Sequence, residues 1–126
     1  MKKIIYTSEA PAPIGPYSQA VLVNDTLYVS GQIALKEAGT LVNENIEVET
    51  HQVMKNLTAV LEKAGGNLSH VVKCTIFVKD MNNFQKINEV YGTYFQEEPP
   101  ARETVEVSRL PKDVNVEISC VAVLTL

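Results

Sequence analysis

The stretch IEVETHQVMKNLTAVLEKAGGNLSHVVKCTIFVKD, residues 46–80, decides the fold. Apolar residues recur at helical spacing through its first half, and Gly65-Gly66 supplies a helix stop. A dense β-branched run follows, which is typical of a strand buried on both faces. We therefore predict a helix from Ile46 to Ala64 and a doubly buried strand from Val71 to Val78. The apolar helix positions are Ile46, Val53, Leu57, Val60, Leu61 and Ala64.

On the C-terminal side of this stretch, the pattern predicts one more helix and two more strands. Asp80 is a suitable N-cap for a helix that runs to about Phe95, before Pro99-Pro100 forbids further helix. Alternating sequence predicts strands at Glu103 to Ser108 and at Val114 to Leu124, joined by a turn at Pro111-Lys112-Asp113. One face of the last strand carries Val114, Val116, Ile118, Cys120, Ala122 and Leu124.

On the N-terminal side, a short strand is expected at Lys3 to Tyr6. Ser18 to Val23 and Leu27 to Ile33 flank the turn residues Asn24-Asp25-Thr26, which predicts a hairpin. Strict alternation in its second strand places Tyr28, Ser30 and Gln32 on one face, and Val29, Gly31 and Ile33 on the other.

These elements predict a single domain over residues 1–126. Two helices can cover one face of a mixed sheet, so the expected fold class is a two-layer α+β domain. The other face of the last two strands is also apolar, with Val105, Val107, Val121 and Val123. Because a large exposed apolar face is costly, we expect it to meet another subunit.

Composition excludes several classes of partner. Eleven Lys and Arg against fifteen Asp and Glu give a net charge of −4, which disfavours a non-specific nucleic-acid binder. No apolar run approaches the roughly 20 residues of a spanning helix, and the apolar start at Ile4-Ile5-Tyr6 lacks a signal cleavage site. We therefore expect a cytoplasmic protein with no membrane partner.

The cysteines and histidines exclude much catalytic chemistry. Cys74 and Cys120 lie in separate strand-like runs without metal-ligand spacing, which favours two buried thiols in a reducing compartment. His51 and His70 are the only histidines and are not spaced as a metal-binding pair. Catalysis must therefore use carboxylates, hydroxyls, Arg or backbone groups.

Arg102 and Glu117 are the main candidate site residues. Arg102 follows Pro99-Pro100-Ala101 on the face of Thr104 and Glu106, and a rigidly held Arg suits bidentate binding of a small carboxylate. A weak surface ion pair with Glu103 is the alternative. Glu117 interrupts the longest strand, on the face of Asn115 and Ser119; it is either solvated on an open face or a general base that holds a water.

Residues 10–18, APAPIGPYS, form a proline-stiffened arm that ends near Tyr17. Such an arm either places a side chain over a site or is an ordinary loop. Ser30-Gly31, in mid-strand, offers a hydroxyl and a point of close approach to backbone.

Several separated motifs carry a family resemblance: IGPYSQA (14–20), SGQI (30–33), VVK (71–73) through VKD (78–80), PAR (100–102) and VEVSRLPKD (105–113). In this order they resemble the RidA/YjgF family of enamine/imine deaminases, over about Tyr6 to Leu124. The resemblance implies a chorismate-mutase-like α+β fold, assembled as a homotrimer whose three sheets enclose a central barrel. It places the active sites between subunits.

The same resemblance implies a reaction and its residues. The family hydrolyses 2-imino acids from pyridoxal-phosphate-dependent Ser/Thr dehydratases to 2-oxo acids and ammonia, so a 2-iminobutanoate/2-iminopropanoate deaminase is expected. No metal or other cofactor is implied. Arg102 would bind the substrate carboxylate and Glu117 would position the attacking water. The cleft would be lined by Tyr17, Ser30, Gly31, Phe84 and Asn88.

One position departs from the family pattern. Many bacterial members carry Arg-Ser-Cys where this chain has Arg102-Glu103-Thr104, so the contact attributed to that Cys rests on Thr104. Strand parity points Glu103 away from Arg102.

Two other functions stay open. One is a regulatory trimer that binds 2-oxo acids without turnover, because a fold does not determine a function. The other is the endoribonuclease or translation inhibitor that the family has also been called. The acidic balance, and the lack of Lys and Arg interleaved with aromatic residues, argue against RNA as the main ligand.

Overall fold

The computed structural model describes all residues from Met1 to Leu126. The strands are β1 (Lys2–Ile5), β2 (Ala20–Val23), β3 (Thr26–Gln32), β4 (Val71–Val78), β5 (Ala101–Glu106) and β6 (Val116–Val123). The helices are α1 (Ile46–Lys63) and α2 (Phe84–Tyr94), with short 3₁₀ turns at Leu68–His70, Met81–Asn83 and Pro111–Asp113. Neither helix has the length and apolar character needed to cross a membrane.

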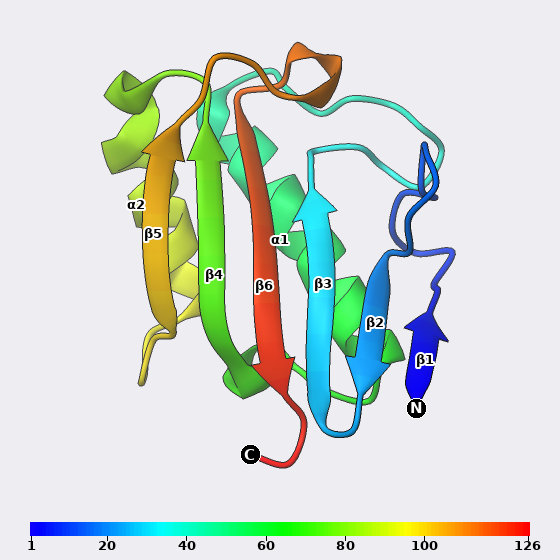
Figure 1. Cartoon of the computed structure of the whole chain (residues 1–126). Helices are drawn as coiled ribbons and strands as arrows, with labels where there is room; N and C mark the ends of the chain where they lie inside the picture. The colour runs from blue at the N-terminus through cyan, green and yellow to red at the C-terminus, as the bar shows by residue number, and fades with distance from the viewer.

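The six strands form one mixed sheet in the order β1-β2-β3-β6-β4-β5. Only β4 and β5 run parallel, and α2 is the crossover between them. Figure 1 looks onto the uncovered face of the sheet, with both helices behind the strands. The predicted two-layer α+β fold is confirmed.

The main core lies between the helices and the sheet. The buried stripe of α1 includes Val53, Leu57 and Leu61, at the spacing that the sequence predicts. Asn45 caps the first turn by accepting from the backbone N–H of Val48 at 2.8 Å. Burial of this stripe against the sheet therefore holds the helix layer in place.

Several predicted boundaries shift by a few residues. The first helix ends at Lys63 with Ala64 as its C-cap, and the strand expected at Lys3 to Tyr6 is β1. Asp80 caps a 3₁₀ turn rather than α2 itself, because its carboxylate accepts from Asn82 at the start of Met81–Asn83. β2 and β6 are shorter than predicted, and β3 begins one residue early at Thr26.

β5 also differs, since it begins at Ala101 and ends at Glu106 rather than spanning Glu103 to Ser108. Its pairing with β4 starts at Ala101, directly after Pro99-Pro100, because prolines have no N–H to donate to the ladder. Arg102 therefore lies inside the strand.

The prediction that β4 is buried on both faces is wrong for the single chain. Cys74, Ile76 and Val78 are buried under the helices, whereas Lys73 and Phe77 on the other face are only half-buried. The run of β-branched residues makes both faces of β4 apolar, but the two helices cover only one of these faces. Cys74 and Cys120 are buried free thiols, as predicted.

The uncovered face carries exposed apolar side chains. Tyr28 and Val105 are 53% and 44% exposed, and Val121 and Val123 are half-buried. Val107 instead packs against a second, smaller apolar cluster at one end of the sheet. The face keeps the apolar character that the sequence predicts for the last two strands.

Candidate active site

The proline-rich arm is fastened to the sheet by a buried amide, that of Gln19. Its Oε1 accepts from the Thr7 N–H at 2.7 Å, and its Nε2 donates to the carbonyls of Thr7 at 3.0 Å and Pro11 at 2.9 Å. The backbone N–H of Ile14 donates to Tyr17 Oη at 3.3 Å. These bonds hold Tyr17 at the edge of a cavity.

The cavity has a volume of about 330 Å³ and lies between the arm, the end of β3 and the start of β6. Its lining includes Ile14, Tyr17, Ser30, Gly31 and Glu117. Ser30 is held in place because its Oγ donates to the Ser18 carbonyl at 2.6 Å. Four of the sequence-predicted site residues therefore meet here: Tyr17, Ser30, Gly31 and Glu117.

The predicted alternation of β3 breaks at this point. The register between β3 and β6 shifts between Val29 and Gln32. Gln32 therefore pairs with Ile118 and is buried on the helix-covered face, whereas strict alternation places it on the exposed face of Tyr28. Gly31 consequently faces Glu117, and a Cβ on Gly31 would collide with the Glu117 carboxylate. The bulge and the missing side chain together make room for that carboxylate.

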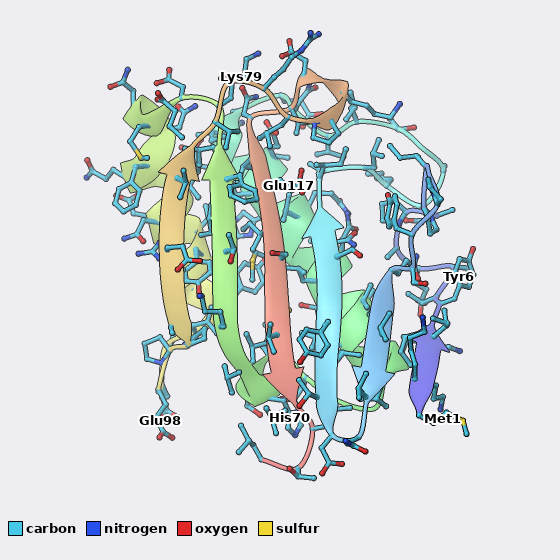
Figure 2. The ribbon with its side chains drawn as sticks, viewed as in Figure 1. Met1, Tyr6, His70, Lys79, Glu98 and Glu117 are labelled. Carbon is cyan, nitrogen blue, oxygen red and sulfur yellow. The ribbon has the colours of Figure 1, made fainter.

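Glu117 lies on the uncovered face of the sheet, where β6 runs beside the end of β3 (Figure 2). Burial raises the pKa of its carboxyl group above the ordinary Glu value. A carboxylate with a raised pKa is a better proton acceptor than an ordinary surface Glu, which suits it to general base catalysis. Ser119 shares this face, but Asn115 turns away, toward Glu49 of α1, which contradicts the predicted grouping.

Arg102 lies on the opposite face, against α2. Its Nη1 donates to Asn88 Oδ1 at 2.8 Å, and its guanidinium carbon lies 5.5 Å and 5.3 Å from the ring centroids of Phe84 and Tyr91. No carboxylate forms an ion pair with it, so its charge is available for a ligand. The predicted residues Phe84, Asn88 and Arg102 therefore form one cluster.

Two buried hydroxyls belong to the Arg102 side of the sheet. Thr104 Oγ1 is buried without a hydrogen-bond partner, and it shares a face with Arg102. Burial raises the pKa of the Tyr91 phenol, and the neighbouring Cys74 thiol adds to the shift, so Tyr91 stays protonated. On the face of Arg102, the hydroxyl of Thr104 therefore has no hydrogen-bond partner within the chain.

Glu103 points away from this cluster, as strand parity predicts. It accepts from Thr75 Oγ1 at 3.2 Å and pairs with Lys73 at 3.2 Å on the uncovered face. The alternative that Arg102 is merely a surface partner of Glu103 is therefore wrong.

The sheet register keeps the two candidate groups apart within one chain. Arg102 is aligned with Cys74 and Cys120, whereas Glu117 is aligned with Phe77 and projects from the other face. One chain thus presents two candidate half-sites. The acid half-site comprises Tyr17, Ser30, Gly31 and Glu117, and the guanidinium half-site comprises Phe84, Asn88, Arg102 and Thr104. No three His, Cys, Asp or Glu side chains gather as a metal site would require.

Sequence reasoning missed Gln19 and Tyr91, which support these half-sites from outside. Tyr91 was detectable in principle, because it follows Phe84 by seven residues and Asn88 by three, which puts all three on one face of a helix. Gln19 gives no such signal, since its partners Thr7 and Pro11 depend on how the arm folds back.

The family model that describes endoribonuclease L-PSP matches residues 7–124 of the chain. Among curated relatives, a RutC family protein of Synechocystis is 56% identical over 125 residues, which is 97% of this chain and 96% of the relative. The 2-iminobutanoate/2-iminopropanoate deaminase of mouse is 47% identical over 124 residues, covering 98% of this chain and 92% of the relative.

Solved structures match the fold closely. A protein of the conserved Rid family from Yersinia pestis superposes with a TM-score of 0.93 at 48% identity, covering 98% of this chain and 99% of that one. E. coli TdcF, solved with bound serine, superposes with a TM-score of 0.92 at 38% identity, covering 96% and 98% of the two chains.

Proposed function

Because the chain belongs to the endoribonuclease L-PSP family, which is the RidA/YjgF family, we propose that it hydrolyses reactive 2-imino acids to 2-oxo acids and ammonia. The proposed substrates are 2-iminobutanoate and 2-iminopropanoate. The observation that carries the proposal is an unpaired, preoriented guanidinium at Arg102, which is suited to one small carboxylate. The deaminase name of the mouse relative and the serine bound to TdcF support the same ligand class.

Arg102 would bind the substrate carboxylate and leave the imine carbon free for attack. Its planar guanidinium can donate two parallel hydrogen bonds, while Asn88 and the two aromatic rings limit its rotation. Thr104 Oγ1 has no hydrogen-bond partner within the chain and would be a further donor if the bound substrate reaches it. Preorganisation of this kind lowers the entropic cost of binding.

Glu117 would activate the water. Its carboxylate accepts a proton from water while the water oxygen adds to the carbon of the protonated imine, which forms a C–O bond and moves the C=N electron pair to nitrogen. The protonated Glu117 then returns that proton to the amine nitrogen. The C–N bond breaks, and its electron pair leaves with ammonia. The hydroxyl proton passes to the Glu117 carboxylate as the C=O bond of the 2-oxo acid forms, and Glu117 then releases that proton to solvent.

The active site would lie between subunits of a homotrimer. The two half-sites project from opposite faces of one sheet, so a second copy must bring its Arg102 to the Glu117 of the first. Association would also cover the apolar face that includes Tyr28, Val105 and Val121. Closed three-fold symmetry would form three equivalent clefts.

Turnover tests this proposal when imine is generated by a threonine dehydratase and 2-oxobutanoate is measured. We expect Arg102→Ala to abolish turnover through lost carboxylate binding, and Glu117→Gln to keep 2-oxobutanoate binding but lose hydrolysis. Arg109→Ala and Glu62→Gln are matched controls, because both side chains are exposed and outside the half-sites. Wild-type rates in Arg102→Ala and Glu117→Gln would refute the assignment.

Ligand binding separates the other functions. Wild-type protein that binds 2-oxobutanoate by calorimetry, yet never accelerates imine hydrolysis, would be a binding trimer. Cleavage of RNA without imine turnover would favour the activity in the family model's description.

A further inference from the structure

Glu49 is a buried charged residue that the proposed reaction does not use. It lies in the first turn of α1 and is 0% exposed. Its Oε2 accepts from the backbone N–H of Asn115, and its Oε1 accepts from the Asn115 side-chain amide, each at 2.8 Å. Both carboxylate oxygens therefore accept hydrogen bonds from one residue, which is 66 positions away in the chain.

Asn115 immediately precedes β6 and is fastened from a second direction as well. Its carbonyl accepts from the Lys79 N–H at 3.0 Å, just beyond the end of β4. Figure 2 shows Lys79 at the end of the sheet where β6 begins. Three hydrogen bonds thus hold the entry to β6, and two of them come from Glu49.

The start of β6 needs this support because β3 does not provide it. The last β3 partner in β6 is Ile118, which pairs with Gln32 beyond the bulge. Val116 and Glu117 pair only with Val78 and Phe77 of β4. The residue that carries the acid half-site therefore lies on a strand segment with one neighbour, and the Glu49 bonds act two residues before it.

Burial of the Glu49 carboxylate is unfavourable if the group serves only to join two elements of structure. Burying a carboxylate costs free energy unless good hydrogen bonds replace its hydration. Two charge-assisted bonds to a single residue give a short and rigid link between the helix layer and the sheet. Rigidity at this point limits how far Glu117 can drift from the water it would activate.

We propose that Glu49 is a positioning residue for catalysis, acting through Asn115 to hold Glu117 in its attacking geometry. The inference rests on the proposed function. It predicts that loosening the link lowers kcat and leaves KM unchanged, because Arg102 and its partners on α2 are untouched.

A charge exchange tests the link. Asn115→Asp sets two carboxylates against each other, whereas Glu49→Gln together with Asn115→Asp restores both bonds: the Gln oxygen accepts from the residue 115 N–H and the Gln amide donates to Asp. We expect kcat of Asn115→Asp to fall about tenfold to a hundredfold, the cost of a small misplacement. The double variant should recover most of the loss.

The control is Glu47→Gln, which changes an acidic residue of the same helical turn with no hydrogen bond to the sheet. Rates are measured well below each variant's melting temperature, so that loss of folded protein does not enter. Wild-type kcat in folded Asn115→Asp, or a loss that the double variant does not recover, would overturn the proposal.

A second readout does not require turnover. The 13C signal of the Glu117 carboxyl, assigned by its loss in Glu117→Gln, reports the pKa of that group by titration. Loss of the Glu49–Asn115 bonds in Asn115→Asp should expose the Glu117 carboxyl and move its pKa toward the ordinary Glu value. The double variant should restore the raised pKa. Identical titrations in all variants would refute the positioning role, whereas absent imine turnover in wild type would refute the proposed function alone.

Discussion

Arg102 combines a hydrogen bond with two ring contacts, and this combination depends on its planar guanidinium group. Its guanidinium packs against the rings of Phe84 and Tyr91 and donates to Asn88, yet its charge has no acidic partner. A Lys at this position would keep the charge but lose the planar fork and the stacking. A Lys at position 102 therefore should not restore the function of Arg102.

Arg102→Lys should raise KM about tenfold to a hundredfold with a smaller effect on kcat, since a bidentate charge-assisted contact contributes roughly 1.5–3 kcal/mol. Steady-state imine hydrolysis measures both constants. Arg109→Lys, an exposed exchange of the same kind, should change neither. A KM equal to that of the wild type in Arg102→Lys would contradict bidentate binding of the substrate carboxylate by Arg102.

Glu117 makes a prediction about stability as well as rate. Its pKa is raised in the folded protein, so the folded state binds its proton more tightly than the unfolded state does. Stability linked to this group is therefore present below the ordinary Glu pKa and is lost as pH rises through the folded value. Glu117→Gln removes the desolvated charge.

Glu117→Gln should consequently melt higher than wild type at neutral pH, because the neutral amide does not carry the desolvation cost of the carboxylate. The difference should vanish at acid pH. Thermal unfolding between pH 3.5 and pH 8 checks this, with Glu62→Gln as control. A constant difference at every pH would mean that the carboxyl pKa is not raised.

Among the elements, β3 shows how one irregularity builds a site. Its bulge turns Gly31 toward Glu117, and the absent Cβ leaves space for the carboxylate. Gly31→Ala should displace Glu117 and lower kcat about tenfold to a hundredfold, as misplaced catalytic groups do. Gly92→Ala is the control, because a Cβ there meets nothing within 4 Å. Unimpaired turnover in Gly31→Ala would show that Glu117 does not need this space.

The elements also show which local signals were sufficient. Apolar spacing predicts the body of α1, and the Gly65-Gly66 stop predicts its end, so the position of this helix follows from local signals. The ends of β5 and β6 do not follow from local signals, because pairing with β4 determines where each strand begins. The alternation expected for β3 failed after Ser30, since a bulge depends on the partner strand.

For the whole molecule, the separation of the half-sites predicts complementation. Arg102→Ala and Glu117→Gln should each be inactive, yet trimers reassembled from a 1:1 mixture should recover about a quarter of the wild-type rate, because each cleft between subunits needs one intact half-site from each neighbour. Co-refolding and the coupled assay measure this. If mixed trimers of verified composition recovered no activity, the active site would not be shared between subunits.

The amino-acid sequence by itself determined the two helices, the strand order along the chain and the apolar character of both sheet faces, because periodicity and turn residues act locally. Strand position and the family resemblance also indicated Arg102 and Glu117 as site candidates. Only the tertiary structure decided that these two lie on opposite faces, that Tyr91 packs on the guanidinium, and that Glu49 fastens the strand before Glu117. Those relations join residues far apart in sequence, and strand register and helix docking alone bring them together.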